Sequence, residues 1–191
     1  MRSIVSLRQV ERKASAFLAR FDSPPIPVQA VAAELGLHIE HVALSDDVSG
    51  VLVVNDDGGV IGVNKDHALV RRRFTIAHEI GHFVLHRKDE QLFIDKGYRV
   101  LFRDENSSLG TDVREREANA FAAELLMPRA LLMRLARSYQ LDLGEEGGPV
   151  EELAAQFQVS AQAMTFRLAS LFGVDDRTFG SRRHSGSARN T

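Results

Sequence analysis

Apolar residues recur along this chain with periods that predict helices in some segments and strands in others. An amphipathic helix is predicted over 7–21, and the proline-rich segment 22–27 breaks it. A second helix is predicted from about residue 28 to 35, ending at Gly36. Strands are predicted at 38–42, 48–54 and 60–63, the last two forming a hairpin across 55–59. These segments predict a small sheet beside helices.

A longer helix is predicted over 65–86, with Asp66 as its cap. Between residues 74 and 85 it is apolar nearly all round, which is typical of a helix in a protein core. It carries the motif HExxH, formed by His78, Glu79 and His82. Residues four apart share one helix face, so both imidazoles can reach one metal ion with Glu79 beside them. Buried imidazoles bonded to backbone carbonyls are the alternative, which suits one histidine better than this spaced set.

A hydrolytic zinc site takes three protein ligands and leaves one position for water. The chain has no cysteine, so the third ligand must be another histidine or a carboxylate. His86 continues the stripe of His78 and His82. However, it lies about 12 Å from His78 along the axis at about 1.5 Å per residue, too far for both to bind one ion. We expect His86 to end the helix or to line the cleft.

A helix over 115–128, stopped by Pro128, provides the better candidate. Its apolar stripe is formed by Ala118, Phe121, Ala122, Leu125 and Leu126. At about 100° per residue, Glu115 lies near this stripe, whereas Glu117 and Glu124 fall on the opposite side. We therefore expect Glu115 to face inward and the other two glutamates to be solvated. Asn119, one turn after Glu115, could orient that carboxylate or a ligand histidine.

Two strings carry a resemblance to a known family: RRFTIAHEIGHFVLH at 72–86 and EREANAFAAELLMP at 115–128. They resemble the ImmA/IrrE metallopeptidases, and segments 26–37 and 49–54 look like the leading helix and hairpin of that family. The resemblance covers roughly residues 7–172. It implies an α+β, zincin-like, gluzincin-type fold, with His78, His82 and Glu115 as zinc ligands and Glu79 as catalytic base. Members of the family typically cleave or otherwise inactivate a helix-turn-helix repressor.

The stretch 87–114 links the two helices of the expected metal site, and its segments 92–94 and 98–102 could pair as a short hairpin. His86 and Tyr98 are both candidate donors to the oxyanion, although Tyr98 could equally be an aromatic packed on the hairpin. In metallopeptidases of this type an edge strand often binds the substrate backbone. The second or third strand is the candidate here, and a purely structural hairpin is the alternative.

Residues 150–171 predict a helix, a tight turn and a second helix, similar to a DNA-binding helix-turn-helix. Arg167 is the single cation of the would-be recognition helix, and Glu151 and Glu152 lie on the preceding helix. DNA binding draws much of its affinity from neutralised phosphates. The pattern therefore favours a structural or partner-docking helix pair over direct DNA binding.

Composition is typical of an intracellular globular protein: the 191 residues include 44% hydrophobic and 26% charged residues, and the net charge is -2. No apolar run approaches the length of a membrane span, and no signal peptide is evident, so cytoplasm is expected. We expect a zincin-like core over 1–148, the helix pair over 149–174 packed on it, and a disordered tail over 175–191.

These patterns predict a zinc-dependent endopeptidase, with manganese as an alternative metal. The resemblance to the ImmA/IrrE metallopeptidases implies that its protein substrate is a helix-turn-helix repressor. Two alternatives stay open. The protein could be a non-catalytic regulator that holds a metal structurally and binds a repressor or DNA. It could also be the toxin part of a toxin–antitoxin pair, which would use the same residues.

Overall fold

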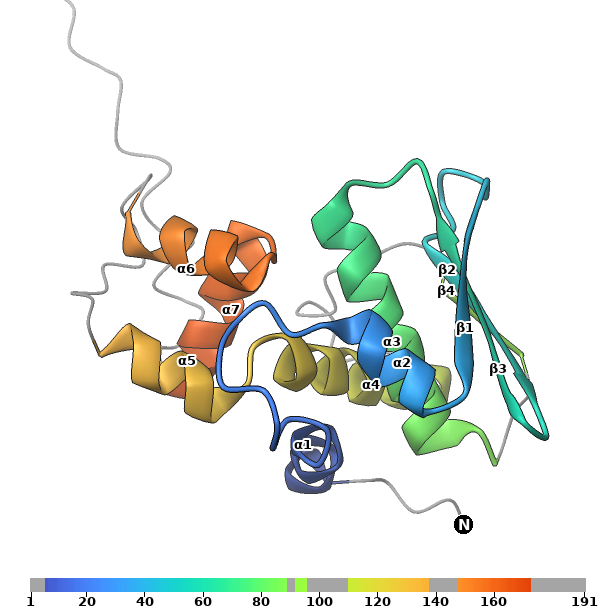
Figure 1. Ribbon diagram of the computed structural model, residues 1–191, viewed down its shortest axis with the longest axis horizontal. Coiled ribbons are helices and arrows are strands. Elements are labelled where there is room, and N and C mark those ends of the chain that lie inside the picture. Colours follow the sequence, from blue (N-terminus) through green and yellow to red (C-terminus); the bar gives the residue numbers. More distant parts are fainter. Residues whose placement is uncertain (1–5, 89–91, 96–109, 138–147, 173–191) are drawn as a thin grey trace, which may run out of the picture.

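The computed structural model describes residues 6–88, 92–95, 110–137 and 148–172. The described part is a mixed α and β structure with a small sheet on one side and helices on the other (Figure 1). Its elements, in chain order, are α1 (Leu7–Ser15), α2 (Val28–Glu34), β1 (Leu37–Val42), β2 (Gly50–Asn55), β3 (Gly58–Asn64), α3 (Leu69–His86), β4 (Leu92–Asp95), α4 (Gly110–Leu126), α5 (Arg129–Ala136), α6 (Pro149–Phe157) and α7 (Ala161–Phe172).

The four described strands form one sheet in the order β1-β3-β2-β4. The predicted hairpin is confirmed, because β2 and β3 pair antiparallel around the turn at Asp56 and Asp57. Strand β1 joins β3 in parallel, and β4 joins β2 antiparallel. The expectation that the second or third strand is an edge is therefore wrong, since the edges among the described strands are β1 and β4. Segment 98–102, the expected partner of 92–94, lies outside the described residues.

Helix α3 begins at Leu69, four residues later than the sequence predicts, and Ala68 rather than Asp66 is its cap. The cause is Asn64, whose side-chain amide nitrogen donates to the carbonyl oxygens of Leu44, Ser45 and Val48 at 3.4, 3.3 and 3.0 Å. Its side-chain oxygen accepts the backbone N–H of Asp66 at 3.1 Å. These bonds hold residues 65–68 in a turn, because they compete with helical hydrogen bonds for the same backbone.

Helix α3 packs between the sheet and α4 (Figure 1). The predicted apolar stripe of α4 is confirmed, since all five of its residues are fully buried. Gly81 is needed where the two helices cross, because a Cβ atom there would lie 3.1 Å from the Cα of Ala118. This close approach brings the HExxH turn of α3 against the first half of α4.

Glu117 and Glu124 are buried, with 6% and 4% of their surface exposed, so the prediction that they are solvated is wrong. Helix α4 is covered by α3 on one side and by α1 on another, and α7 contacts its end through Arg167. Glu124 forms an ion pair with Arg167 and accepts the Ser15 hydroxyl at 3.3 Å. Polar groups outside the apolar stripe are therefore buried against partners that come from distant segments.

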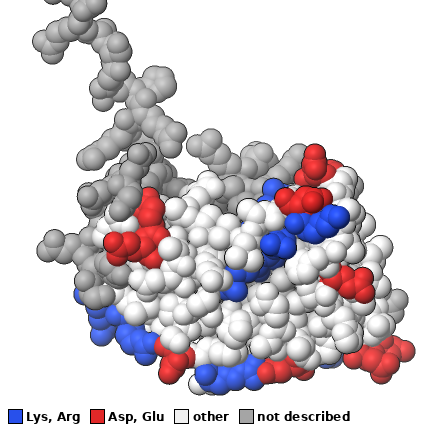
Figure 2. Space-filling view, turned by 45° about the horizontal axis from the view of Figure 1, so that its top comes forward, with Lys and Arg blue, Asp and Glu red and all other residues white. Residues whose placement is uncertain are grey.

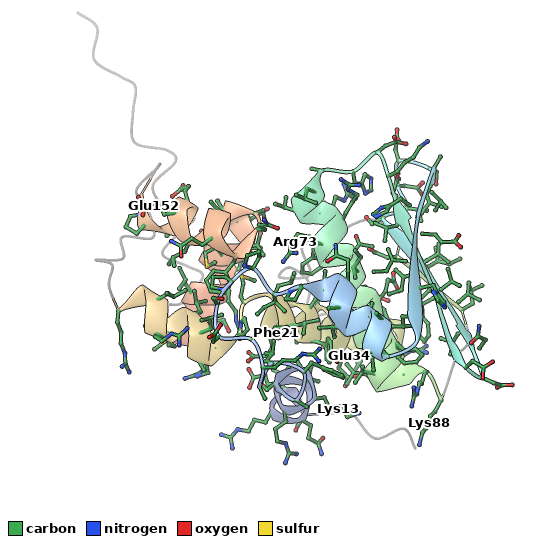
Figure 3. All side chains as sticks on the ribbon, in the orientation of Figure 1. Lys13, Phe21, Glu34, Arg73, Lys88 and Glu152 are labelled. Atoms are coloured by element: carbon green, nitrogen blue, oxygen red, sulfur yellow. The ribbon has the colours of Figure 1, made fainter. Side chains whose placement is uncertain are left out.

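Helices α6 and α7 form the predicted pair, separated by a tight turn in which Gln158 has a φ of 53°. Arg167 is buried and also donates to the carbonyl oxygen of Met127 at 3.2 Å. Arg73 of α3 lies in the space between α3 and this pair (Figure 3) and donates to the carbonyl oxygens of Ile26 and Gln158. The helix pair is thus tied to the rest of the protein by buried arginines.

The remaining segments are α1, α5 and the C-terminal tail. Helix α1 ends at Ser15 and is followed by turns, so it is shorter than predicted. Helix α5 lies in a region where no helix or strand was predicted. The tail at 175–191 lies outside the described residues, and the division into a core and a helix pair stays a prediction. In the described part of the chain, no helix combines the length and apolar character that a membrane span requires.

Candidate metal centre

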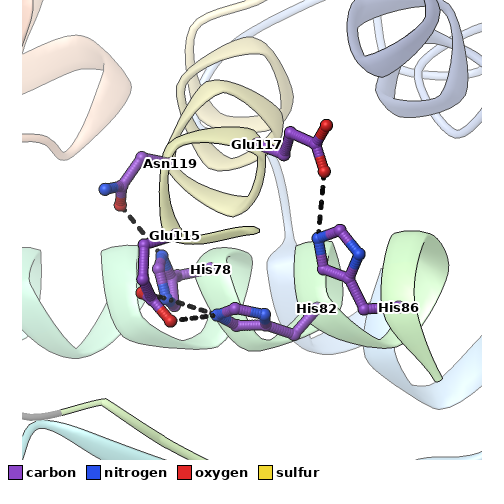
Figure 4. Close-up of polar contacts among 6 residues, drawn as sticks. All are labelled: His78, His82, His86, Glu115, Glu117 and Asn119. Carbon is purple, nitrogen blue, oxygen red and sulfur yellow. Dashed lines mark hydrogen bonds and ion pairs between the residues drawn. The ribbon is translucent and has the colours of Figure 1, made fainter. Parts of the chain in front are cut away.

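Side chains of α3 and α4 converge at the crossing of the two helices (Figure 4). The Nε2 atoms of His78 and His82 lie 3.0 Å apart. The carboxylate of Glu115 lies 3.2 Å from Nε2 of His78 and 3.3 Å from Nε2 of His82. The histidines are buried, and Glu115, which is half-buried, is the most exposed of the three. Among the described residues, these three form a group whose nitrogen and oxygen atoms lie close enough to hold one metal ion, and this group is the candidate metal-ligand cluster.

The spacing of these atoms fits a tetrahedral metal ion. Zinc binds nitrogen and oxygen ligands at about 2.0–2.1 Å, and a tetrahedral arrangement then separates the ligand atoms by about 3.3 Å. The three observed separations lie close to this value. Two ring nitrogens facing each other need a shared proton or a cation between them, because both otherwise present lone pairs. The two imidazoles and the carboxylate are therefore suited to hold a divalent cation.

The two histidines are oriented in different ways. Nδ1 of His78 lies 2.9 Å from the side-chain oxygen of Asn119. If that nitrogen carries the proton, it donates to Asn119, and the lone pair on Nε2 faces Glu115. The His82 ring has no such bond at Nδ1 within the described chain, and it stacks on Phe93 of β4 at 4.7 Å and lies 5.7 Å from the ring of His86. A hydrogen bond thus orients the His78 ring, and packing orients the His82 ring.

Glu79 is fully buried, and its two carboxylate oxygens have no hydrogen-bond partner among the described residues. It packs against the start of β2, where a Cβ on Gly50 would come within 3.1 Å of Glu79 Oε1. Burial raises the pKa of Glu79 to about 8, although the charge of His78 opposes this shift. A carboxylate that is costly to ionise and has no partner is typical of functional groups that exchange protons.

The charges of the cluster compensate one another. Burial alone would lower the pKa of His78. The hydrogen bond to Glu115 and the charges of Glu79 and Glu115 outweigh burial and raise this pKa to about 9. Burial lowers the pKa of His82. Burial raises the pKa of Glu115, but its bonds to both histidines outweigh this and hold it well below its ordinary value. The cluster thus combines a carboxylate that favours its charged form with two histidines whose pKa values are shifted in opposite directions.

His86 is the last residue of α3, as predicted, and it is buried. It faces a different carboxylate from the one that His78 and His82 face. Its Nε2 lies 3.4 Å from Oε2 of Glu117 on α4 (Figure 4). The sequence argument that His86 is too distant to share an ion with His78 agrees with this arrangement. Tyr98, the other candidate donor, lies outside the described residues.

Two residues near the cluster were not singled out from the sequence. Phe93 of β4 stacks on the His82 ring. Asp95, the last residue of β4, is close enough for its charge to raise the pKa of His78, and burial raises its own pKa. The predicted strand at 92–94 includes Phe93 and ends directly before Asp95. Nothing in the sequence indicated that this strand pairs with β2 and lies beside the metal-ligand cluster.

Comparison with protein families gives one match of broad extent. The model of peptidase family M78, described as the IrrE N-terminal-like domain, matches residues 30–169. This range includes all of α3 and α4, and therefore His78, Glu79, His82, Glu115 and Asn119.

Two individual proteins are also similar. The chain is 26% identical over 123 residues to the protein named Metallopeptidase ImmA of Bacillus subtilis (strain 168), covering 64% of this chain and 63% of that protein. The chain thus spans somewhat less than two thirds of this curated relative. A solved Mycobacterium tuberculosis transcriptional regulator has a similar fold, with a TM-score of 0.57, 19% identity, and coverage of 84% of this chain and 46% of that one.

Proposed function

Because the chain belongs to peptidase family M78, the family of the IrrE N-terminal-like domain, we propose that it is a zinc-dependent endopeptidase. The observation that carries this proposal is the convergence of two imidazole nitrogens and one carboxylate on a single point, with the unpartnered carboxylate of Glu79 on the same helix. His78, His82 and Glu115 would hold the metal, and manganese is an alternative to zinc because the ligand set suits both.

A bound divalent cation in such a site lowers the pKa of water and polarises a carbonyl group. Glu79 is the residue that accepts the proton of the attacking water and then delivers it to the leaving amine. Its burial favours this role, since a carboxylate whose pKa is raised toward neutrality can both take up and release a proton. Asn119 fixes the ring of His78, and Phe93 fixes the ring of His82, so that both Nε2 atoms keep their positions.

His86 Nε2 faces Oε2 of Glu117 on α4 at 3.4 Å and turns toward a different carboxylate from the one that His78 and His82 contact. This arrangement favours a positioning role for His86 over stabilisation of the oxyanion. Strand β4 is the strand best placed to receive a substrate backbone, because among the described strands it is the edge strand that carries Phe93 and Asp95 beside the metal-ligand cluster.

For the substrate we propose a helix-turn-helix transcriptional repressor, whose cleavage relieves repression. The basis is the similarity of the HExxH helix and of α4 to the ImmA/IrrE metallopeptidases, together with the match to the protein named Metallopeptidase ImmA. Direct DNA binding by the α6–α7 pair is disfavoured. Its one arginine, Arg167, is buried against Glu124 and is not free to meet a phosphate.

The test is a cleavage assay on helix-turn-helix regulators encoded near this protein's own gene, with zinc or manganese added, read by mass spectrometry of the products. Wild type should cleave one regulator at a defined bond, and Glu115→Ala should not. If the regulator is bound but stays intact with either metal, the non-catalytic alternative replaces the peptidase. If added metal is not bound at all, both fail.

A further inference from the structure

Helices α1 and α5 border a groove of about 1260 Å³. The two helices lie on the side of the molecule away from strand β4, which is next to the metal-ligand cluster (Figure 1). Five arginines line the groove: Arg8 and Arg12 of α1, Arg129 and Arg134 of α5, and Arg137, which directly follows α5. All five are exposed. In Figure 2, Lys and Arg side chains gather along the lower margin, the side on which α1 and α5 lie in Figure 1, with some acidic groups between them. The net charge of the whole chain is -2, so this concentration of positive charge is local.

Three arginines elsewhere in the described chain have clear partners. Arg20 pairs with Glu34, Arg167 pairs with Glu124, and Arg73 donates to two carbonyl oxygens. In the groove, Arg134 donates to the carbonyl oxygen of Asp22, but the side chains of the other four arginines make no hydrogen bond or ion pair with a described residue. Arg129 is also the first residue of α5, where a positive charge opposes the helix dipole.

The two acidic residues of the lining do not offset this charge. Glu124 is buried at the base, where it is already paired with Arg167 and accepts the backbone N–H of Arg129 at 3.2 Å. Glu11 is the single other carboxylate among the described lining residues. Bringing several like charges together costs free energy that an anionic ligand would offset. The groove therefore has the electrostatic character of a site for an anion.

The shape and lining indicate which anion. Single-stranded nucleic acid is bound through aromatic side chains on which bases stack, and the described lining contains none. Duplex DNA is read by a protruding helix or ribbon, whereas this surface is concave between two helices. Ala130 and Met133 give the groove an apolar part beside its arginines. An apolar strip bordered by guanidinium groups suits an amphipathic acidic polypeptide, because arginine forms paired bonds with carboxylates.

We propose that the groove between α1 and α5 is a docking site for an acidic segment of a partner protein. It is separate from the metal centre, since Glu124 at its base lies about 13 Å from Glu115 along α4. If the peptidase function holds, the partner is the protein substrate, and the groove adds affinity and selectivity that the cleavage site itself does not supply. The docking itself does not rest on peptidase activity.

The test is fluorescence anisotropy with a labelled peptide of repeated Glu and Leu, a matched peptide with Gln in place of Glu, and single- and double-stranded DNA. The full-length protein carries Glu79→Gln, so that cleavage cannot interfere. The variant Arg12→Glu/Arg137→Glu reverses two charges in the groove, and neither side chain has a partner whose loss would disturb the fold. The control Lys65→Glu/Lys88→Glu makes the same change of net charge on exposed residues outside the groove.

We expect the acidic peptide to bind, the Gln peptide not to bind, and the groove variant to weaken binding by about tenfold or more while the control stays close to the parent. Binding should weaken as salt is added. The proposal is overturned if the acidic peptide does not bind at low ionic strength, if both double variants lose affinity equally, or if DNA binds more tightly than the peptide. Each of these results leaves the cleavage assay of the peptidase unaffected, so the two claims fail separately.

Discussion

Oε2 of Glu117 lies 3.4 Å from Nε2 of His86, and this buried pair joins the two helices that carry the metal centre. Replacing Glu117 with alanine should lower the free energy of unfolding by about 1–3 kcal/mol, because the buried imidazole of His86 loses the carboxylate that faces it. Urea unfolding followed by circular dichroism measures this. Arg116→Ala, at an exposed neighbouring position of α4, is the matched control and should change little. An unchanged unfolding free energy for Glu117→Ala would mean that the pair contributes nothing.

Glu115 and Glu117 contact different histidines, although they are only two residues apart. Glu115→Ala should weaken zinc binding by more than about 100-fold, because it removes one of three ligands. Glu117→Ala should change zinc affinity much less, since its carboxylate contacts His86 and not the ligand cluster. Competition with a chromogenic chelator measures both affinities. The reverse ranking would refute the assignment of Glu115 as the ligand.

The contrast between these glutamates shows how far the sequence predicts the site. The period of apolar residues in α4 correctly predicted that Glu115 faces α3, because it lies beside the buried stripe. The same reasoning failed for Glu117 and Glu124. A helical wheel treats the far side of a helix as solvent, whereas here His86 of α3 faces Glu117, and Ser15 of α1 and Arg167 of α7 contact Glu124.

Long-range pairing was likewise beyond local patterns. The hairpin of β2 and β3 was predictable from two alternating segments and a glycine-containing turn. The parallel pairing of β1 with β3, and the position of β4 beside β2, depend on contacts between segments that are distant in the chain. Helix α3 begins later than predicted because the Asn64 side chain bonds to the preceding loop. Helix propensities do not include such bonds between a side chain and a distant loop.

Asn119 should matter to metal affinity although it is not itself a ligand. Its side-chain oxygen lies 2.9 Å from Nδ1 of His78, so Asn119→Ala should weaken zinc binding by about 10–100-fold through loss of the ring's orientation. Asn119→Asp keeps an oxygen acceptor and should recover most of the affinity. Isothermal titration calorimetry with zinc measures the series. Equal affinities for the parent and Asn119→Ala would show that the contact does not orient the histidine.

Arg167 should act on stability and not on nucleic acid. Arg167→Ala leaves Glu124 buried without its ion-pair partner, which should cost about 3–5 kcal/mol of unfolding free energy. Gln162→Ala, at an exposed position of the same helix, provides the control. Chemical unfolding measures the loss. The parent protein should not shift duplex DNA in a gel at low salt, and a shift that disappears in Arg167→Ala would instead indicate a DNA-binding role.

Zinc should stabilise the folded protein, because a ligand that binds the native state alone raises its free energy of unfolding. The melting temperature should rise with added zinc in the parent and in Glu79→Gln, and should fall back when a chelator is added. His78→Ala and Glu115→Ala should show no such rise. Differential scanning calorimetry makes the comparison. A rise of equal size in Glu115→Ala would place the bound zinc elsewhere.

The most direct test of the proposed peptidase is to measure zinc content and repressor cleavage together in the parent and in Glu79→Gln. The account predicts one zinc per chain in both proteins, with a defined cleavage product from the parent and none from the variant, because Glu79 moves protons and does not hold the metal. Cleavage by Glu79→Gln at the parent's rate would contradict the central claim.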